Sequence, residues 1–520
     1  MINIKTSNMI KYTKRVVTIL IVLVLSGCTD LDEKVYSSIP ADKFYNNETE
    51  IIMAMGRAYT HLRGGNTNIW GLIGTNTVAA DEAIIPFREQ NLWWDGGYWI
   101  DLHRHQFYDA LWPVVDSWNF VFEGVTLCNK LILQIEESPV TFEGKDGLVA
   151  ELKILRAYYF YHGIDLFGGI PMSTDFENTE LPTITDRKSA FEFIVSDINE
   201  NIGLLQDYSS PATYGRATKS VGYAILAKLY INSEEWTGTA RWDEAKAACD
   251  AIINMNRYIL EPDYFSNFSP TNENSQENIF VIPFDRITTT GWYNNLLMHC
   301  FTLHSLSAQT FGFSAFTWDG IAATEEQYNL YDSNDSRINS WMEGPQFSAG
   351  GDPLMISPGR QLTYRPKLAS LYDVNNLALL DDGVRCQKWA FEPGLLDNQS
   401  MSNDWAIFRY ADILLIKAEA IMRKNGGSAN GEALALVNQV RERAYGNANN
   451  NYTSLDLAEL LNERGRELAW EGHRRQDQIR FGTWGNTWFK KTASSDHLKL
   501  YPIPFTAMST NNKLEQNPGY

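Results

Sequence analysis

Two pairs of helix-forming segments constrain the fold of this chain more than any other feature. Apolar side chains recur every three or four positions in TKSVGYAILAKLYINS and again in RWDEAKAACDAIINMN, which follows it closely. The later segments DWAIFRYADILLIKAEAIMRK and GEALALVNQVRERA form a second pair, and the apolar stripe of the first of these runs from Ile407 to Ile421. Small residues such as Ala245 and Ala418 lie on the inner faces, where another helix can approach closely. Each pair spans about 35 residues, so the sequence predicts tetratricopeptide-like helical hairpins.

Helical periodicity marks five further segments and is missing from two regions. The additional helices are expected at residues 48–62, 112–136, 151–166, 189–205 and 456–481. Residues 70–112 and 263–403 are instead rich in Gly, Pro, Asn and aromatic residues, with short strand-like runs such as IFVIPF. The predicted fold class is therefore mainly α: a tetratricopeptide-like helical-hairpin scaffold with an inserted irregular, loop-rich ligand-binding lobe.

This pattern divides the chain into five parts. The expected boundaries are 1–27 for a lipoprotein signal peptide, 28–46 for an N-terminal tether, 47–262 for an N-terminal part of helical repeats with the aromatic loop 70–112, 263–403 for the irregular lobe, and 404–520 for the C-terminal helical repeats. Loops on a rigid scaffold usually carry recognition, so ligand binding is expected in the two irregular regions.

The N-terminus has the features of an exported lipoprotein. Lys11, Lys14 and Arg15 precede an apolar run at residues 16–25, which is typical of a secretory signal peptide. That run is too short to cross a bilayer, which needs about 20 apolar residues. The sequence Leu-Ser-Gly-Cys at residues 25–28 looks like a lipobox, so Cys28 is predicted to carry lipid and to begin the mature, tethered protein. The alternative is a chance cysteine in an ordinary signal peptide.

The charge balance narrows the possible partners. The chain has 44 basic and 63 acidic residues, for a net charge of −19 at pH 7. Such a field repels nucleic acid and anionic membrane surfaces, so neither is expected as a partner and membrane contact is expected through the lipid anchor only.

No sequence motif supports catalysis or metal binding. HExxH, GxSxG, GxGxxG and a glycine-rich phosphate loop are all missing, so no catalytic residue and no cofactor is predicted. The acidic residues leave a glycosidase-type carboxylate pair as an alternative. His103 and His105 lie two apart in DLHRH, on one side of an expected strand, but no third ligand is near, which favours ordinary polar packing. The segment DSNDSR resembles a calcium loop, but Arg337 stands where glycine is needed, so a turn or helix cap is expected.

Four cysteines follow Cys28 in the sequence. They are far apart, and no CxxC pair occurs among them, so structural zinc and redox motifs are unsupported. Free buried thiols or a disulfide are both compatible with an exported protein. The four are Cys128, Cys249, Cys300 and Cys386.

Aromatic residues are unusually frequent, at 13% of the chain, and several lie in the irregular regions. In PFREQNLWWDGGYW they alternate with amide and charged side chains, which combines flat apolar faces with groups that bind hydroxyls. Sugars need this combination. The candidate stacking residues are Phe87, Trp93, Trp94, Trp292, Tyr293 and Trp318, and the candidate hydrogen-bonding residues are Arg88 and Gln90. For each aromatic residue taken alone, a place in the core is the alternative.

Several longer motifs together resemble the SusD/RagB family of surface glycan-binding lipoproteins. They are the lipobox, ELKILRAYYFYHGIDLFGGIP, FRYADILLIKAEAI, RGRELAWEGHRRQDQIRFG and the C-terminal YPIPFTAMSTNNKLEQNPGY. The resemblance implies four tetratricopeptide-like helical pairs beside a less regular lobe that holds the glycan site. It also implies a non-enzymatic protein in the cell outer membrane that faces the exterior and passes oligosaccharide to a SusC-like TonB-dependent transporter.

The resemblance also bears on single residues. The starch-binding member of the family cups its ligand in an arc of aromatic residues, and the first part of that arc falls near Ile85 and Phe87, where this chain has no tryptophan. A later tryptophan of the arc matches Trp318, and an aromatic before it falls near Trp292 or Tyr293. The calcium loop of the family is poorly matched at SPTNENSQE, so no calcium is predicted. The alternative function is a helical-repeat lipoprotein of the same uptake type that binds a peptide or protein.

Overall fold

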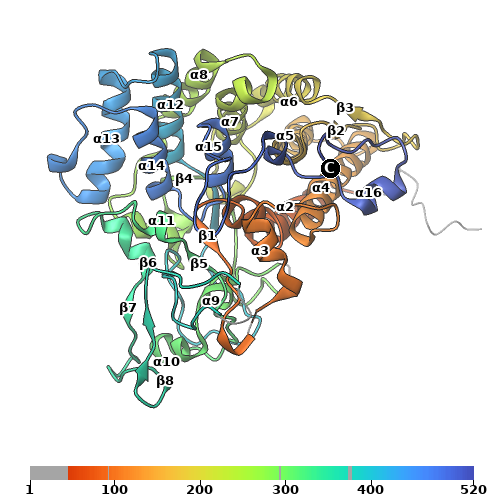
Figure 1. The fold of residues 1–520 in the computed structure, drawn as a ribbon. Coiled ribbons are helices and arrows are strands. Elements are labelled where there is room, and N and C mark those ends of the chain that lie inside the picture. The colour runs from red at the N-terminus through yellow and green to blue at the C-terminus, as the bar shows by residue number, and fades with distance from the viewer. Residues whose placement is uncertain (1–44, 92, 292–293, 373–376) are drawn as a thin grey trace, which may run out of the picture.

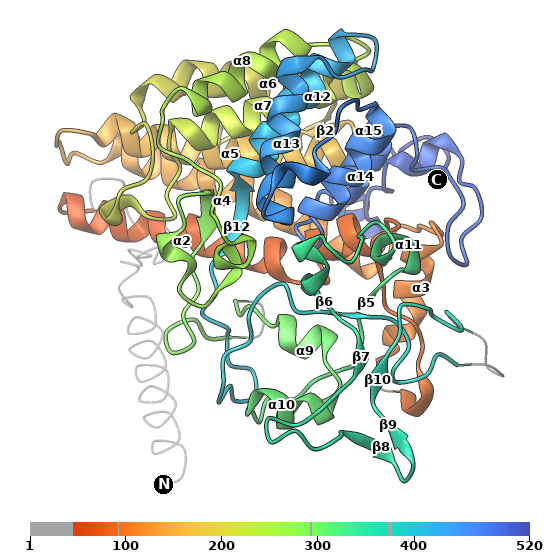
Figure 2. The ribbon, with the colours of Figure 1, turned by 90° about the vertical axis from the view of Figure 1, so that its left-hand side faces the viewer.

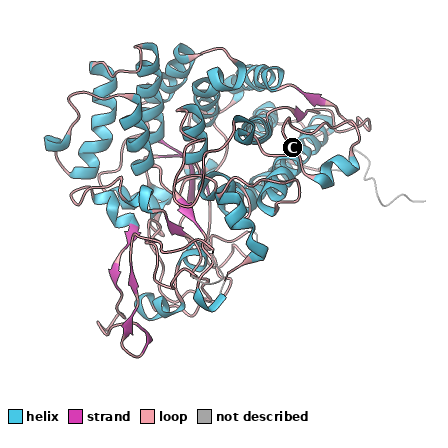
Figure 3. Cartoon of the chain, in the orientation of Figure 1, coloured by secondary structure: helices cyan, strands magenta, loops and turns pink. Residues whose placement is uncertain are grey.

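Antiparallel helices build the upper part of the molecule in Figure 1, and an irregular lobe lies below them. The computed structural model describes residues 45–520 except 92, 292–293 and 373–376, so Cys28, Trp292 and Tyr293 lie outside the described residues. Helix dominates the secondary structure, as Figure 3 shows, which confirms the predicted mainly α class. The long helices are α2 (Glu48–Thr67), α4 (Trp112–Glu137), α5 (Lys145–Phe167), α6 (Arg187–Asn201), α7 (Lys219–Thr237), α8 (Trp242–Ile253), α12 (Tyr410–Lys424), α13 (Gly431–Tyr445) and α14 (Leu457–Glu467).

The helices begin where side chains can bind their free backbone N–H groups. Asn47, Asp186, Asn430 and Asp456 each precede a helix and accept a hydrogen bond from the backbone three residues later. Gly238 ends α7 at a φ of 73°, a left-handed conformation that glycine adopts without strain. These local signals explain why the helix positions can be read from the sequence.

Both predicted hairpins are present, and they pack against each other. Helix α7 contacts α8, α8 contacts α12, and α12 contacts α13, which gives the continuous helical layer seen in Figure 2. Ala224, Ala245 and Ala418 are fully buried along these contacts, as expected from their small size. Helices α4, α5 and α6 continue the layer towards the N-terminus.

Two predicted helices were wrong in part. Residues 405–409 form strand β12 (Trp405–Arg409), paired antiparallel with β4 (Asn278–Ile282), and the helix begins only at Tyr410. This pairing places the IFVIPF run in a strand, as expected, and Ile407 in a strand instead of a helix. A single helix over 456–481 is interrupted between α14 and α15 (Arg474–Arg480), where Trp470 has a φ of 68°.

The interruption has a physical cause, because it frees backbone groups for side chains of the lobe and of the aromatic loop. The carbonyls of Glu467 and Ala469 accept hydrogen bonds from Lys388 Nζ at 3.4 and 2.7 Å, and the Trp470 N–H donates to Glu82 at 2.8 Å. Periodicity cannot reveal such tertiary partners.

The lobe is built from short antiparallel strand pairs and single helical turns. Its pairs are β6 (Trp341–Met342) with β11 (Arg385–Cys386), β7 (Gly344–Pro345) with β10 (Thr363–Tyr364), β8 (Met355–Ser357) with β9 (Arg360–Gln361), and β5 (Ala322–Ala323) with β1 (Ala83–Ile84) of the aromatic loop. The pair β2 (Ile170–Pro171) with β3 (Ile184–Thr185) lies outside the lobe. The short helices are α3 (Tyr98–His103), α9 (Met298–Thr302), α10 (Ala308–Phe311), α11 (Glu325–Tyr328) and, near the C-terminus, α16 (Phe505–Thr510).

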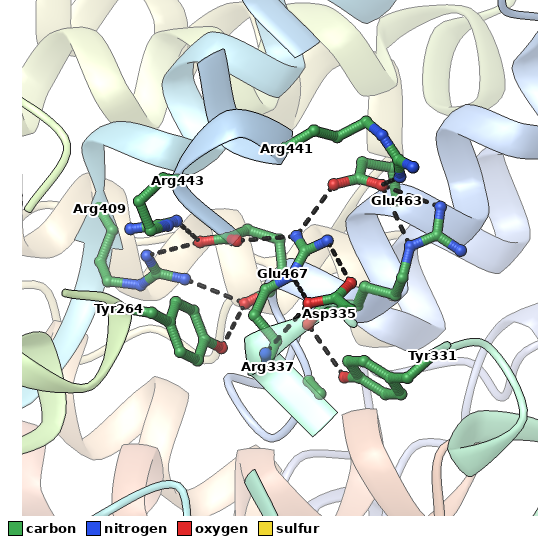
Figure 4. Close-up of polar contacts among 12 residues, drawn as sticks. Tyr264, Tyr331, Asp335, Arg337, Arg409, Arg441, Arg443, Glu463 and Glu467 are labelled. Atoms are coloured by element: carbon green, nitrogen blue, oxygen red, sulfur yellow. Dashed lines mark hydrogen bonds and ion pairs between the residues drawn. The ribbon is translucent and has the colours of Figure 1, made fainter. Parts of the chain in front are cut away.

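A buried ionic cluster, shown in Figure 4, joins the lobe to the helices. Arg337, from the lobe, pairs with Asp335 at 2.7 Å and with Glu463 and Glu467 of α14 at 2.9 and 3.1 Å. Glu467 also pairs with Arg409 at 3.0 Å. Asp335 accepts the N–H of Arg337 and so caps a short 3-10 turn, which confirms the turn or cap predicted for DSNDSR.

Further members extend the cluster on the side of Arg409. Arg409 also pairs with Glu471 at 2.7 Å, and Lys388 of the lobe pairs with the same carboxylate at 2.6 Å. Burial by itself would raise the pKa of Glu471, but Arg409 and Lys388 lower it to about 2. The Tyr264 hydroxyl donates to the Glu467 carbonyl at 2.9 Å. The lobe is thus fixed to the scaffold by charges that hold one another in place.

The paired histidines and the cysteines of the described chain are buried within the fold. His103 ends α3 and His105 lies two residues beyond it, so neither lies in the expected strand. His103 contacts the Phe489 carbonyl at 2.7 Å, and His105 contacts the Ala79 carbonyl at 2.8 Å. The four cysteines after Cys28 are buried and free.

Within the described ranges, no grouping of His, Cys, Asp and Glu could hold a metal ion. None of the described helices is both long enough and apolar enough to cross a membrane.

Candidate functional site

The adjacent residues Trp93 and Trp94 lie in opposite environments. Trp93 is only 9% exposed, and its ring fills the space beside Gly320, where an added Cβ would lie 2.0 Å from the indole. Trp94 belongs to a different apolar cluster and is partly exposed. Its indole N–H makes no hydrogen bond to any described residue. Of the two tryptophans offered by the sequence, Trp94 is therefore the one with a face for a ligand.

Trp93 belongs to a packed group of rings around Asp95. The Asp95 carboxylate accepts hydrogen bonds from Trp93, from Trp99 at 3.0 Å and from the Tyr98 hydroxyl at 2.8 Å. Trp318 lies edge-on to Trp93, with ring centroids 4.9 Å apart. The structure thus brings together two predicted residues, Trp93 and Trp318, but in a cluster that mainly stabilises the loop.

Phe87 and Trp94 form a second group with Tyr372, which we call the aromatic platform. The Trp94 and Tyr372 rings are stacked, with centroids 5.0 Å apart and planes 28° apart, and Phe87 lies 4.6 Å from Trp94. Tyr372 is 39% exposed, and Phe87 and Trp94 are partly exposed. Three adjoining, partly exposed rings suit the stacking of sugar C–H groups.

The backbone holds this platform in place from two sides. The Phe87 N–H donates to the Leu371 carbonyl at 2.9 Å, and the Ala378 N–H donates to the Phe87 carbonyl at 3.1 Å. Gly97 has a φ of 91°, and an added Cβ there would lie 2.8 Å from the Trp94 ring. A glycine is therefore needed beneath Trp94, which explains part of the GG pair in the sequence.

The structure corrects the role predicted for Arg88. This residue is 2% exposed, and its guanidinium donates to the carbonyls of Asp319, Leu379 and Asp382, each at 2.7 Å. Burial lowers the pKa of Arg88 to about 10, although the nearby Asp319 acts in the opposite direction. Arg88 fastens three loops to one another and cannot reach a ligand at the surface.

Gln90 and Trp318 keep positions compatible with ligand contact. Gln90 is exposed and adopts a φ of 68°. Trp318 is partly exposed, and its backbone N–H is fixed by the Cys300 carbonyl at 2.8 Å.

Sequence reasoning missed Tyr372, the third ring of the platform. It lies in SLYDVNN, a segment with a single aromatic residue and no periodic pattern. Only its position beside Trp94 gives it importance, and a lone tyrosine in a loop carries no signal of that position. The exposed neighbours of the platform, Arg360 and Arg365, were missed for the same reason.

Surface grooves also lie away from the platform. One, of about 570 Å³, runs along α4 beside Phe122 and is closed by Phe176 and α16. Another, of about 580 Å³, lies between Ile259, Tyr410 and the end of α13. Their presence shows that the helical layer also offers hollows to a partner.

The helical-repeat layer and the loop lobe define a class of protein built on helical hairpins with an inserted irregular lobe. A sequence profile described as the SusD family matches residues 253–520. A second profile, described as "Starch-binding associating with outer membrane", matches residues 31–231. Because the first profile covers more than half of the sequence, the chain belongs to the SusD family.

Individual relatives agree with this assignment. The chain is 26% identical over 417 residues to the starch-binding protein SusD of Bacteroides thetaiotaomicron, covering 71% of this chain and 72% of that protein. It is 23% identical over 552 residues to the SusD-like protein P2 of Formosa agariphila, covering 97% and 99%.

Solved structures show the same fold. Surface glycan-binding protein A of Bacteroides thetaiotaomicron, in complex with laminarihexaose, superposes with a TM-score of 0.75 at 21% identity and covers 91% of this chain and all of that one. A laminarin-binding SusD-like protein superposes with a TM-score of 0.74 at 20% identity, covering 92% of this chain and all of that one.

Proposed function

We propose that this protein is a surface lipoprotein that binds an oligosaccharide at the aromatic platform. The observation that carries the proposal is the stacked, partly exposed set of Phe87, Trp94 and Tyr372 in a lobe held rigidly on the scaffold. The names of several SusD-family relatives support a glycan ligand, since one is a starch-binding protein and another was solved with laminarihexaose. Gln90 and Trp318 are proposed as further contacts, and Trp292 or Tyr293 as additional stacking residues.

The proposal includes a place in the cell. Lipid on Cys28 tethers the protein to the outer membrane, where it faces the exterior and hands its ligand to a SusC-like TonB-dependent transporter. A profile that describes association with the outer membrane supports this location. The protein acts by binding, without catalysis and without a cofactor.

The expected affinity is modest. Each good stacking or hydrogen-bonding contact with a sugar contributes about 1 kcal/mol, so a few contacts give a Kd in the micromolar range or weaker. Weak binding permits fast release, which a protein that passes its ligand to a transporter requires.

Calorimetry with a panel of oligosaccharides tests the site. Trp94→Ala is expected to weaken glycan binding about tenfold, because it removes the central ring of the platform. Tyr208→Ala serves as the control, since Tyr208 is also exposed, at 41%, but lies in the link between α6 and α7. Unchanged glycan affinity in Trp94→Ala would remove the platform as the site.

The alternative, binding of a peptide or protein, is favoured by the groove beside α13. Its lining includes Ile259 and Tyr410 together with Glu261 and Glu442, which suits a peptide with apolar and basic side chains. Binding of such peptides, without binding of any oligosaccharide in the panel, would establish this alternative.

A further inference from the structure

Cationic side chains gather beside the aromatic platform although the chain as a whole has a net charge of −19. Arg360, Arg365 and Lys367 all reach solvent there. Any anionic ligand is repelled by the protein at large, so a local group of cations next to a ligand surface bears directly on which sugar it accepts.

Glu89 connects these cations to the platform, because it lies two residues after Phe87. Arg88 between them is 2% exposed, whereas Phe87 and Glu89 are both partly exposed. Glu89 pairs with Arg360 at 2.7 Å and also accepts the Leu380 N–H at 3.1 Å. Arg360 therefore lies close to the segment that carries Phe87 of the platform.

A single buried carboxylate fixes both arginines. The Asp381 side chain is fully buried, and it pairs with Arg360 at 2.7 Å and with Arg365 at 2.7 Å. Burial by itself would raise the pKa of Asp381, but the hydrogen bonds from Arg360 and Arg365 outweigh it and lower that pKa. The carboxylate stays ionised, and the two guanidinium groups are held in defined positions above it.

Some donors of these cations stay free. Arg360 pairs with Glu89 and Asp381, and Arg365 pairs with Asp381 alone. The Arg365 side chain is 50% exposed, and only its Nη1 forms an ion pair. Within the described chain, neither its remaining N–H groups nor Lys367 Nζ has a partner. A guanidinium with free donors presents the fork that carboxylate and sulfate groups bind in bidentate fashion.

The arginine pair lies close in the chain to the platform. Ala378 lies beside Phe87, and Asp381 follows three residues later in a turn, in which the Asp382 N–H donates to the Leu379 carbonyl at 3.2 Å.

We propose that the ligand of the aromatic platform is an anionic oligosaccharide, with one ring stacked on Trp94 and Tyr372 and a carboxylate or sulfate group bound by Arg365 and Arg360. This inference rests on the proposed glycan-binding function and adds the chemical class of the sugar. Arg365 supplies most of the selectivity, because its free donors face the solvent, and Asp381 positions it.

Matched pairs of sugars test the charge requirement. Calorimetry of the full mature protein would use tetragalacturonate beside its neutral methyl ester, and a sulfated galactan tetrasaccharide beside its desulfated form. The acidic member of at least one pair is expected to bind about tenfold more tightly, and its affinity is expected to fall as salt is raised from 50 to 500 mM. The pair that shows the effect identifies carboxylate or sulfate.

Arg365→Gln is expected to remove this preference, so that the affinity for the acidic sugar falls to that for its neutral partner. Arg257→Gln, at a residue that packs on Tyr208 far along the helical layer, is the matched control and is expected to change nothing. Equal affinity for acidic and neutral sugars in the wild type would overturn the anionic class and leave glycan binding intact. Binding of none of these sugars, nor of laminarihexaose, would overturn the proposed function as well.

Discussion

The helical scaffold and the irregular lobe are stabilised in different ways. Helices α12, α13 and α14 share an apolar cluster, in which Leu414, Val437 and Leu460 are buried, and ion pairs such as Asp412–Arg464 at 2.9 Å lie beside it. The lobe also has apolar residues, but its loops are joined by arginines that donate to backbone carbonyls. Arg385, for example, is fully buried and donates to the Asp382 and Leu380 carbonyls, each at 2.8 Å.

The difference follows from backbone hydrogen bonding. A helix satisfies its own N–H and C=O groups, so its faces need only apolar contact with neighbours. Loops leave carbonyls without partners, and a buried carbonyl without a hydrogen bond is costly. Arg88, Arg385 and Lys388 supply the missing donors. The lobe can therefore be irregular enough to shape a site and still be rigid.

The largest expected effect comes from breaking the ionic joint between the two regions. Arg337→Ala leaves Asp335 and parts of Glu463 and Glu467 buried without their cation, so the free energy of unfolding is expected to fall by about 3–5 kcal/mol. Urea denaturation followed by tryptophan fluorescence measures this change.

An exposed ion pair provides the control for that experiment. Lys424 of α12 pairs with Asp243 of α8 at 2.6 Å, but both side chains are more than 60% exposed. Lys424→Ala is expected to cost less than about 1 kcal/mol. Similar small losses in both variants would mean that the lobe is not held by its buried charges.

The scaffold is expected to respond to loss of apolar volume. Leu414→Ala removes a side chain of α12 that is 1% exposed in the apolar cluster, and it is expected to lower the free energy of unfolding by about 2–4 kcal/mol. Leu434→Ala, at a partly buried position of α13, should cost less. Glycan affinity should be unchanged in both folded variants, since the apolar cluster is distant in sequence and structure from the platform. A weaker affinity in Leu414→Ala would contradict the independence of the two regions.

The pH dependence of stability sharpens the comparison further. Glu82 lies at the joint, where it accepts the Trp470 N–H at 2.8 Å, and burial raises the pKa of Glu82 to about 8 from an ordinary value of 4.5. Between these two values the unfolded chain is ionised at this residue while the folded chain holds a proton. The contribution of Glu82 to the free energy of unfolding is complete below about pH 4.5 and is lost as the pH rises through about 8.

Glu82→Gln removes this titration and keeps an acceptor for Trp470. Between pH 5 and 7 the wild type is expected to lose about 1 kcal/mol of stability per pH unit relative to the variant. Urea midpoints of both proteins across this range measure the difference, and all other titrating groups cancel in it. Parallel pH profiles would show that Glu82 does not titrate in this range.

Neighbouring residues show how far the sequence could predict the site. The motif PFREQNLWWDGGYW correctly located a cluster of aromatic and polar side chains, but it gave Trp93 and Trp94 equal weight. Trp93 lies against Gly320 and Trp94 against Tyr372, and both partners are more than 200 residues away in the sequence. The same limit explains Arg88, whose polar character suggested a ligand contact and whose partners are loop carbonyls.

The sequence by itself determined the helices, the two hairpins and the family, because helical periodicity, capping residues and small inner-face residues act within a few positions of the chain. It also located the aromatic loop. Only the tertiary structure decided where the helix over 456–481 breaks, which tryptophan has an accessible face, and which arginines reach solvent. Each of these depends on groups that long-range folding brings together, and no local pattern records which loop will supply them.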